Sequence, residues 1–166
     1  MGKDLSEMSL EELWELFPIF LVAHDDRWKD DFNEIGKTLT GLLSDQPIVR
    51  ISHIGSTAIQ GIWAKNIVDV MVEIPQSADM KDMAQILEQN GFTIMSSEAN
   101  RISLNKGYTE NGFADKVYHI HLRYAGDNDE LYEPAEPMFN IYHISPHETQ
   151  NSDEFVTEIC YPVKKK

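Results

Sequence analysis

Apolar positions recur along the chain with two periods, one typical of helices and one typical of strands. Residues 10–17 carry an apolar stripe at helical spacing, and Ser9 with Glu12 forms the capping box that predicts where this helix begins. A longer stripe with steps of three and four residues predicts an amphipathic helix over residues 26–43. We expect a third helix to begin after Ser77 and to end at an Asn-Gly stop signal.

Other segments are rich in β-branched and aromatic residues and are bounded by turn signals, as expected of strands. An apolar run at residues 19–23 predicts a short buried strand, and residues 67–74 form the clearest strand of the chain. The remaining predicted strands cover residues 48–54, 92–97, 101–106, 116–124 and 155–162. Runs of strands with few intervening helices favour an α+β fold with a mainly antiparallel or mixed sheet.

Composition limits the domain organisation. The length of 166 residues and 42% hydrophobic content suit one ordinary globular domain. Three prolines fall within residues 133–146, so we expect a domain over residues 1–132 and a Pro-rich extension over residues 133–166 that ends in a strand. Cys160 is the one cysteine, which excludes an intrachain disulfide. The three tryptophans, Trp14, Trp28 and Trp63, are interpreted as core or loop-anchoring residues.

Acidic residues dominate the charge balance. Asp and Glu number 28 against 14 Lys and Arg, and the formal net charge at pH 7 is −14. Such a field repels polyanions, so we expect no binding to nucleic acid. A single nucleotide stays compatible with this charge, because a few fixed groups and a divalent metal neutralise its phosphates locally. The longest apolar runs reach about eight residues, too few to span a membrane, and we expect a cytoplasmic protein.

Two predicted strands carry polar side chains on one face. In the clearest strand, alternation places Asp69 on the face opposite the valines. In the strand over residues 116–124, it places His119 and His121 together, about 7 Å apart, a spacing at which two imidazoles reach one metal ion. If both apolar faces pack on the same helices, Asp69 becomes a third ligand and Arg101 joins the same polar face. Two solvated histidines without an ion are the alternative.

The loop after residues 48–54 offers groups that suit a phosphate. Gly55, Ser56 and Thr57 combine a turn-forming glycine with two hydroxyl groups, which can present N–H and O–H donors to phosphate oxygens. Lys65 could add a positive charge at the entry to the acidic strand. An ordinary turn and a solvated lysine are the alternative interpretations.

Several segments together resemble the signature of the GrpB family, small bacterial proteins whose fold resembles that of the nucleotidyltransferase superfamily. The segments are HIGSTA at residues 53–58, GIWAK at 61–65, IVDVMVEI at 67–74, RISLNKG at 101–107 and HIHL at 119–122, with HDDRWKDDF in the first long helix. The resemblance covers about residues 10–132. It implies a nucleotidyltransferase-like mixed sheet with helices packed on one face.

The resemblance also implies a mechanism and exposes a departure from it. In active nucleotidyltransferases a Gly-Ser pair holds the triphosphate, and two acids two residues apart on the next strand bind Mg²⁺ for phosphoryl transfer. Gly55 and Ser56 match the pair, and Asp69 matches the first, catalytic acid. Met71 stands where the second acid is expected. Either the two histidines replace the missing ligand, or the domain has lost catalysis and keeps a pocket.

These expectations define a candidate site and its ligands. Asp69, His119 and His121 would hold a divalent metal (Mg²⁺, Mn²⁺ or Zn²⁺), and Gly55, Ser56, Thr57, Lys65 and Arg101 would bind a small phosphate-containing ligand. The ligand would be a nucleotide or a coenzyme A-like compound, since GrpB-like domains also occur fused to dephospho-coenzyme A kinase. A catalytically inactive module that binds a ligand or a protein is the alternative. Residues 133–166 could complete a sheet edge or a homodimer contact.

Overall fold

The computed structural model describes residues 8–126, 132–134, 139–144, 156–160 and 163–165. The chain divides into two compact units, Met1–Asp127 and Asn128–Lys166. The first unit holds the predicted helices and seven strands, and the second holds four short strands. Among the described residues, no helix is both long and apolar enough to cross a membrane.

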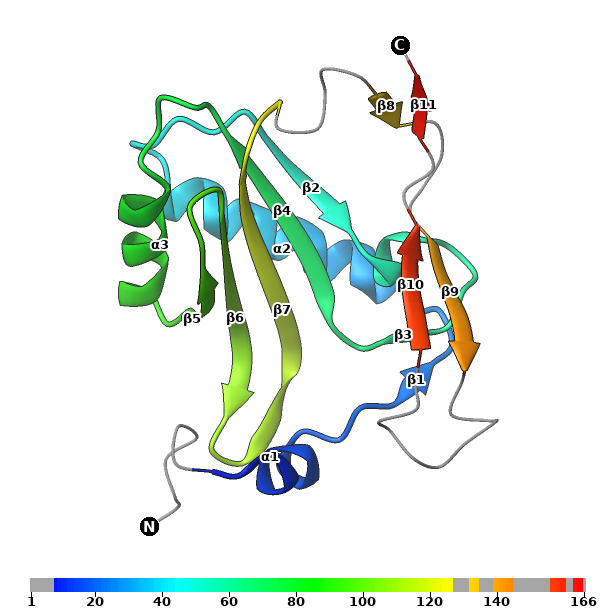
Figure 1. Cartoon of the computed structure of the whole chain (residues 1–166). Coiled ribbons are helices and arrows are strands. Elements are labelled where there is room, and N and C mark those ends of the chain that lie inside the picture. Colours follow the sequence, from blue (N-terminus) through cyan, green and yellow to red (C-terminus); the bar gives the residue numbers. More distant parts are fainter. Residues whose placement is uncertain (1–7, 127–131, 135–138, 145–155, 161–162, 166) are drawn as a thin grey trace. The chain divides into compact units, whose positions relative to one another are not determined.

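A mixed five-stranded sheet forms the centre of the first unit (Figure 1). Its strands lie in the order β2-β4-β7-β6-β5; β4 and β7 run parallel, and every other neighbouring pair is antiparallel. The bounds are β2 Arg50–Ile54, β4 Val68–Ile74, β5 Thr93–Ser97, β6 Arg101–Thr109 and β7 Gly112–Tyr124. This arrangement confirms the predicted α+β class with a mixed sheet, although β6 and β7 extend further than predicted.

Two amphipathic helices cover one face of this sheet. In Figure 1, α2 (Arg27–Leu42) lies behind the sheet, and α3 (Met80–Gln89) packs beside it. Leu39 and Leu87 on these helices are fully buried, as are the alternate residues Val70 and Val72 of β4. Burying an aliphatic side chain of this size contributes about 1.5–3 kcal/mol. The sheet therefore has one apolar face under the helices and one face turned away from them.

The start of α3 differs from the prediction. Asp79, and not Ser77, caps this helix: its carboxylate accepts hydrogen bonds from the backbone N–H groups of Lys81 and Asp82 at 2.8 and 3.3 Å. The segment before it forms a turn in which the N–H of Ala78 donates to the carbonyl of Pro75. Because residues 75–78 form this turn directly after β4, α3 begins at Met80, two residues later than expected.

The apolar run at residues 19–23 is not the buried strand that the sequence predicted. The structure has a two-residue strand, β1 (Leu21–Val22), paired antiparallel with β3 (Ala64–Lys65) in a ribbon separate from the main sheet. Ile19 and Phe20 are 56% and 69% exposed. A two-stranded ribbon lacks neighbours on both sides, so an apolar run within it keeps much of its surface in water.

The tryptophans differ in how deeply they are buried. Trp28 is buried in the core, and its indole Nε1–H donates to Asn66 Oδ1 at 2.7 Å. Trp63 is 62% exposed, so it is not a core residue, and its loop-anchoring role stays a prediction. It directly precedes β3, which pairs with β1, where Val22 is 39% exposed. The side chain of Trp14 lies outside the described part of the chain.

The first helix and the loop after β2 border the uncovered side of the sheet. The capping box of α1 (Leu10–Leu16) is confirmed, with Ser9 and Glu12 exchanging hydrogen bonds. Phe17 follows this helix and packs against Tyr108 and Phe113, with ring centroids 4.9 and 5.1 Å apart. The loop after β2 contains a 3₁₀ turn, η2 (Ser56–Ala58).

The second unit consists of paired strands. β9 (Phe139–Ile144) pairs antiparallel with β10 (Val156–Cys160), and β8 (Tyr132–Pro134) pairs antiparallel with β11 (Val163–Lys165). β10 lies within the predicted strand over residues 155–162, whereas the sequence did not indicate the other three.

Candidate functional site

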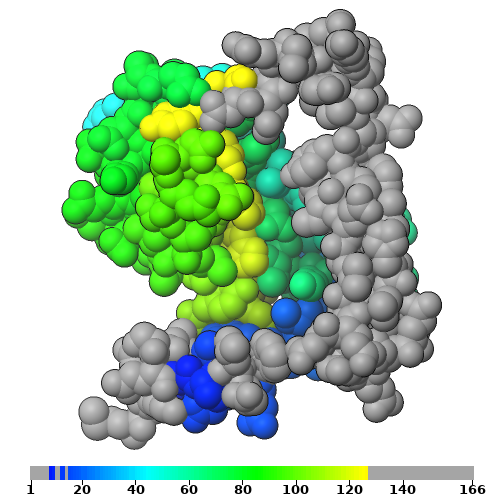
Figure 2. Space-filling view, viewed as in Figure 1, coloured from blue at the N-terminus to red at the C-terminus, as the bar shows by residue number. Residues whose placement is uncertain are grey.

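The sheet face turned away from α2 and α3 carries polar side chains in three cross-strand rows, and atoms of β7 reach the surface of the first unit there (Figure 2). Each row contains residues that lie directly opposite one another on β2, β4, β7 and β6. Neighbouring rows are about 7 Å apart along the strands. The first row is Ile54, Asp69, His119 and Asn105; the second is Ser52, Met71, His121 and Ser103; the third is Arg50, Glu73, Arg123 and Arg101.

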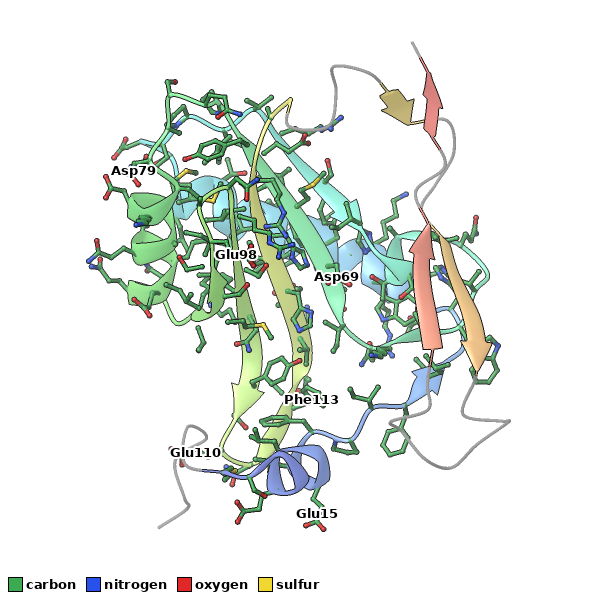
Figure 3. All side chains as sticks on the ribbon, viewed as in Figure 1. Glu15, Asp69, Asp79, Glu98, Glu110 and Phe113 are labelled. Atoms are coloured by element: carbon green, nitrogen blue, oxygen red, sulfur yellow. The ribbon has the colours of Figure 1, made fainter. Side chains whose placement is uncertain are left out.

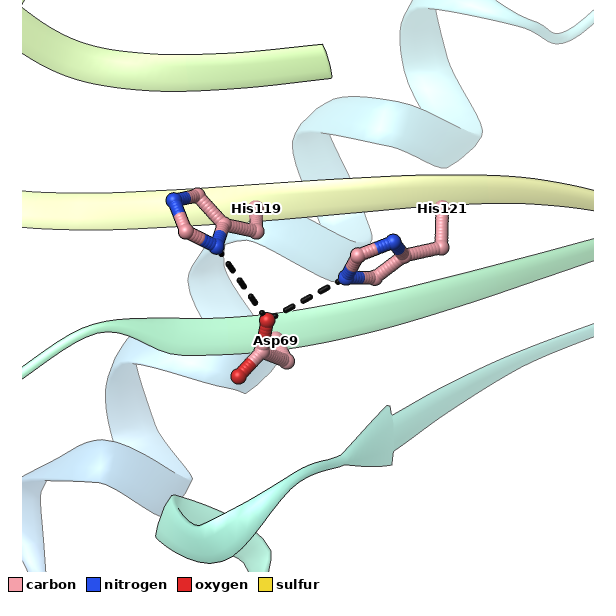
Figure 4. A group of neighbouring side chains, drawn as sticks. All are labelled: Asp69, His119 and His121. Carbon is pink, nitrogen blue, oxygen red and sulfur yellow. Dashed lines mark hydrogen bonds and ion pairs between the residues drawn. The ribbon is translucent and has the colours of Figure 1, made fainter. Parts of the chain in front are cut away.

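Asp69, His119 and His121 meet on this face (Figure 4). Oδ1 of Asp69 lies 3.4 Å from Nδ1 of His119 and 3.2 Å from Nε2 of His121. One ligand atom from each residue lies within 4.8 Å of the other two. The structure thus brings the three side chains together as the alternation of the two strands predicted. Their role as metal ligands stays a prediction.

Each histidine has an inner ring nitrogen, which faces Asp69, and an outer ring nitrogen, which faces away from it. Each outer nitrogen lies next to a hydroxyl group. Tyr108 Oη lies 3.0 Å from His119 Nε2, and Ser103 Oγ lies 3.3 Å from His121 Nδ1. A hydroxyl group can accept a hydrogen bond from a ring N–H, which leaves the other ring nitrogen with a lone pair. In metal sites, such partners fix the orientation and the tautomer of the ligating imidazole. Both inner nitrogens face Asp69 Oδ1, to which each can donate a hydrogen bond when it carries the proton.

Electrostatics keep the Asp69 carboxyl ionised. Burial raises its pKa, but hydrogen bonds with His119 and His121 outweigh that effect, and the net pKa lies below the usual range. Burial, with a smaller contribution from the charge of Asp69, raises the pKa of Tyr108. At neutral pH the site therefore combines a carboxylate with a protonated phenol that can donate or accept a hydrogen bond.

Tyr108 is the member of this site that the sequence analysis missed. Regular alternation from Arg101 would put residues 101, 103, 105 and 107 on the polar face and Tyr108 on the other. The register instead shifts between Lys106 and Tyr108, next to Gly107. Gly107 has φ +101°, and a Cβ there would lie 2.3 Å from the carbonyl oxygen of Lys116. A glycine inside a strand often marks a bulge, so Gly107 was the available signal.

Gly55 lies directly against the Asp69 carboxylate. Its φ is +73°, and a Cβ there would lie 2.6 Å from Asp69 Oδ2. Glycine is thus required both by the backbone conformation and by the close approach to the carboxylate. Ser56 follows at the start of η2 and is half-buried. The hydroxyl group of Thr57 is buried and lies 2.9 Å from His53 Nε2, so it already has a partner within the loop.

The two predicted cations lie apart from the three clustered residues. Lys65 is exposed on β3, opposite Leu21 of β1. Arg101 shares the polar face but lies in the third row, where its Nη2 donates to Glu98 Oε1 at 2.7 Å. Within the described part of the chain, neither residue forms a hydrogen bond or ion pair with the clustered side chains.

Comparison with known proteins decides the family. Residues 18–134 match the family model described as GrpB protein. The chain belongs to the GrpB family. Among curated GrpB relatives, a UPF0157 protein of Halalkalibacterium halodurans is 30% identical over 97 residues, covering 58% of this chain and 49% of that protein. The UPF0157 protein YqkA of Bacillus subtilis is 26% identical over 121 residues, covering 71% of this chain and 34% of that protein.

A solved structure supports the fold. The crystal structure of conserved protein GrpB from Enterococcus faecalis matches with a TM-score of 0.54 at 21% sequence identity, covering 65% of this chain and 63% of that chain. The chain spans about half and about a third of the length of the two curated relatives described above. The match confirms the GrpB-type α+β fold.

Proposed function

We propose that this GrpB-family domain binds one divalent transition-metal ion through Asp69, His119 and His121, and that the bound ion holds a phosphate group of a small ligand. Two imidazoles and one carboxylate form a three-ligand set that leaves a coordination position open, as in catalytic zinc sites. Imidazole ligands suit Zn²⁺ and similar ions better than Mg²⁺. We therefore narrow the expected metals to Zn²⁺ first and Mn²⁺ second.

One observation carries this proposal: each imidazole has its outer nitrogen at a hydroxyl group and its inner nitrogen at the same carboxylate oxygen. Two histidines on a merely solvated sheet face would not need partners on both ring nitrogens. A site built to orient ligands does need them.

The position of Met71 favours a metal site in which another ligand replaces the second carboxylate, over a domain that has lost metal binding. Met71 lies directly opposite His121 in the parallel pairing of β4 and β7. An imidazole on the neighbouring strand therefore stands beside the position at which the nucleotidyltransferase pattern has its second acid. This supports the hypothesis that a histidine replaces the missing carboxylate.

The loop beside Asp69 supports the proposal of a phosphate ligand. Gly55 brings the backbone against the carboxylate, and the half-buried residue Ser56 follows with its hydroxyl group. A metal ion at Asp69 would neutralise a phosphate within reach of this loop. We propose a nucleotide or a coenzyme A-like compound as the ligand. A more specific hypothesis is that the domain transfers a nucleotidyl group from a bound nucleotide. The same compounds serve to test it.

Calorimetric titration of the purified, metal-free protein with Zn²⁺, Mn²⁺ and Mg²⁺ tests the proposal. We expect one equivalent of Zn²⁺ to bind, and Asp69→Asn to weaken binding at least tenfold, because the variant removes the charged ligand and keeps its shape. Asp45→Asn is the matched control, since Asp45 is exposed in the loop after α2. Equal Zn²⁺ affinity in Asp69→Asn and the native protein would disprove the metal site.

Thermal unfolding with a panel of nucleotides and coenzyme A tests the ligand. A ligand at one hundred times its dissociation constant stabilises the folded state by about 2.7 kcal/mol. We expect this shift to need both the ligand and Zn²⁺. A shift of the same size in Asp69→Asn would show that the ligand binds elsewhere.

A further inference from the structure

The first row of the polar face runs from the Gly55–Ser56 loop, over the candidate metal centre, to a buried asparagine. Its members, in the order of the strands, are Ile54 on β2, Asp69 on β4, His119 on β7 and Asn105 on β6. Neighbouring strands lie about 4.8 Å apart, so the backbones at Asp69 and Asn105 are about 10 Å apart across the sheet. A ligand whose phosphate lies between the loop and the metal can therefore extend along this row to Asn105.

The side-chain amide of Asn105 has no partner within the protein. The residue is 9% exposed, and its amide forms no hydrogen bond with any described residue. In the described part of the chain, Nδ1 of His24 is the one fully enclosed side-chain polar atom without a partner, so the amide atoms of Asn105 still reach solvent. Amide groups in protein interiors normally have hydrogen-bond partners. A nearly enclosed amide that is still open to solvent is available to a ligand.

The strand pairing places the Asn105 side chain on the same face as the candidate metal ligands. Asn105 lies directly opposite His119 in the antiparallel pairing of β6 and β7, and side chains at such positions share a face of the sheet with Cβ atoms about 4.5–5.5 Å apart. Leu104, the preceding residue, is fully buried in the core on the other face. The amide is therefore a neighbour of the His119 imidazole, outside the core under α2 and α3.

Aromatic rings continue this face beyond His119. The Tyr108 ring stacks on the His119 imidazole, with ring centroids 5.9 Å apart, and the rings of Phe113 and Phe17 pack against Tyr108. In Figure 3, Phe113 lies beyond Asp69 in the direction of α1. Tyr108 and Phe113 are half-buried, so each keeps part of its surface accessible. An amide beside such residues suits a flat heteroaromatic group, which stacks on aromatic rings and forms hydrogen bonds in its own plane.

We propose that Asn105 binds the base of a nucleotide, and that the site selects a base with a hydrogen-bond donor next to an acceptor, as in adenine. An asparagine amide can form two hydrogen bonds with adenine, to the N6 amino group and to N7. Adenine also occurs in coenzyme A, so it is the group that the two ligands proposed above share. This inference rests on the proposed function, because the phosphate of the nucleotide is the one that the metal holds.

Titration of the Zn²⁺-loaded protein with AMP, IMP and ribose 5-phosphate tests the proposal. AMP and IMP have the same sugar and phosphate, but the base of IMP has a carbonyl group in place of the amino group, and ribose 5-phosphate has no base. We expect AMP to bind about tenfold more tightly than IMP, as the loss of one hydrogen bond typically gives. Coenzyme A has the same base on a different phosphate chain, and a higher affinity for it than for AMP would identify coenzyme A as the source of the adenine.

A variant of the asparagine locates the effect. Asn105→Leu removes the amide and keeps its size, so it should reduce the tenfold preference for AMP to about twofold or less. Its affinities for Zn²⁺ and ribose 5-phosphate should stay unchanged, which also shows that the variant is folded. Asn33→Leu is the matched control and should keep the preference, because Asn33 is exposed on α2, which covers the other face of the sheet.

The outcomes separate this subsite from the proposed function. Equal affinity of the native protein for AMP and IMP, a measurement that needs no variant, would overturn the subsite. A preference for AMP that is unchanged in Asn105→Leu would overturn it as well. Failure of Zn²⁺ itself to bind to the native protein would overturn the proposed function instead.

Discussion

Replacing Gly55 by alanine should damage both stability and metal binding, because the new methyl group would meet the Asp69 carboxylate. Gly55 has φ +73° and ψ −175°, a region that is essentially restricted to glycine and costs other residues about 1–3 kcal/mol. The added Cβ would lie 2.6 Å from Asp69 Oδ2 and 3.1 Å from Asp69 Cβ. Forcing an extra carbon into packed surroundings typically costs about 1–3 kcal/mol more.

The two contributions predict a loss of about 2–6 kcal/mol from the free energy of unfolding. Gly61→Ala separates them, since Gly61 also has a positive φ, +83°, but nothing lies within 4 Å of its Cβ position. Gly61→Ala should therefore show the backbone cost alone, about 1–3 kcal/mol. Urea unfolding of both variants, with EDTA present, measures the difference.

A double-mutant cycle completes this test. Asp69→Ala removes the carboxylate, so it should recover part of the loss in a Gly55→Ala background, and the coupling energy should exceed about 0.5 kcal/mol. Gly55→Ala should also weaken Zn²⁺ binding, because the displaced carboxylate no longer faces both histidines. If Gly55→Ala costs no more than Gly61→Ala and leaves Zn²⁺ affinity unchanged, the packing of this loop on Asp69 is wrong.

Two further predictions concern the surroundings of the site. Tyr108→Phe keeps the aromatic packing but removes the hydroxyl group at His119 Nε2. The Zn²⁺ affinity, measured by chelator competition, should therefore fall about tenfold. An unchanged Zn²⁺ affinity would refute the proposal that Tyr108 orients His119. Burial lowers the pKa of His53 in the folded protein, so the unfolded chain takes up a proton first as the pH falls. The free energy of unfolding should therefore be complete above about pH 6.5 and decline as the pH falls below that value. His53→Gln should reduce the slope of the free energy of unfolding against pH by up to about 1.4 kcal/mol per pH unit, as measured by urea unfolding of the metal-free protein. Parallel curves of unfolding free energy against pH for the two proteins would contradict this interpretation.

The sequence predicted the polar face because alternation within one strand is a local property. Asp69, His119 and His121 follow from a two-residue period and from the apolar residues between them, and the structure brings these three together. The relative position of the two strands was an assumption, since pairing depends on contacts far apart in the chain. It was correct because both apolar faces pack under the same helices.

Features that depend on non-local pairing or on local irregularity were not predictable in the same way. The third row joins Arg50, Glu73 and Arg123 from three strands, and their alignment follows from the strand order and register. Tyr108 reaches the polar face through the register shift beside Gly107, which interrupts the alternation. The exposure of the apolar run at residues 19–23 likewise depends on its pairing with β3 outside the main sheet.

X-ray absorption at the zinc edge of the Zn²⁺-loaded protein tests the central claim most directly. Binding through His119, His121 and Asp69 predicts two imidazole nitrogens at about 2.0–2.1 Å, a carboxylate oxygen at about 2.0–2.2 Å and a remaining light-atom ligand. The imidazole signal should be lost in a His119→Ala and His121→Ala double variant. A sulfur shell near 2.3 Å, which would require Cys160, or an unchanged spectrum in the double variant would contradict the account.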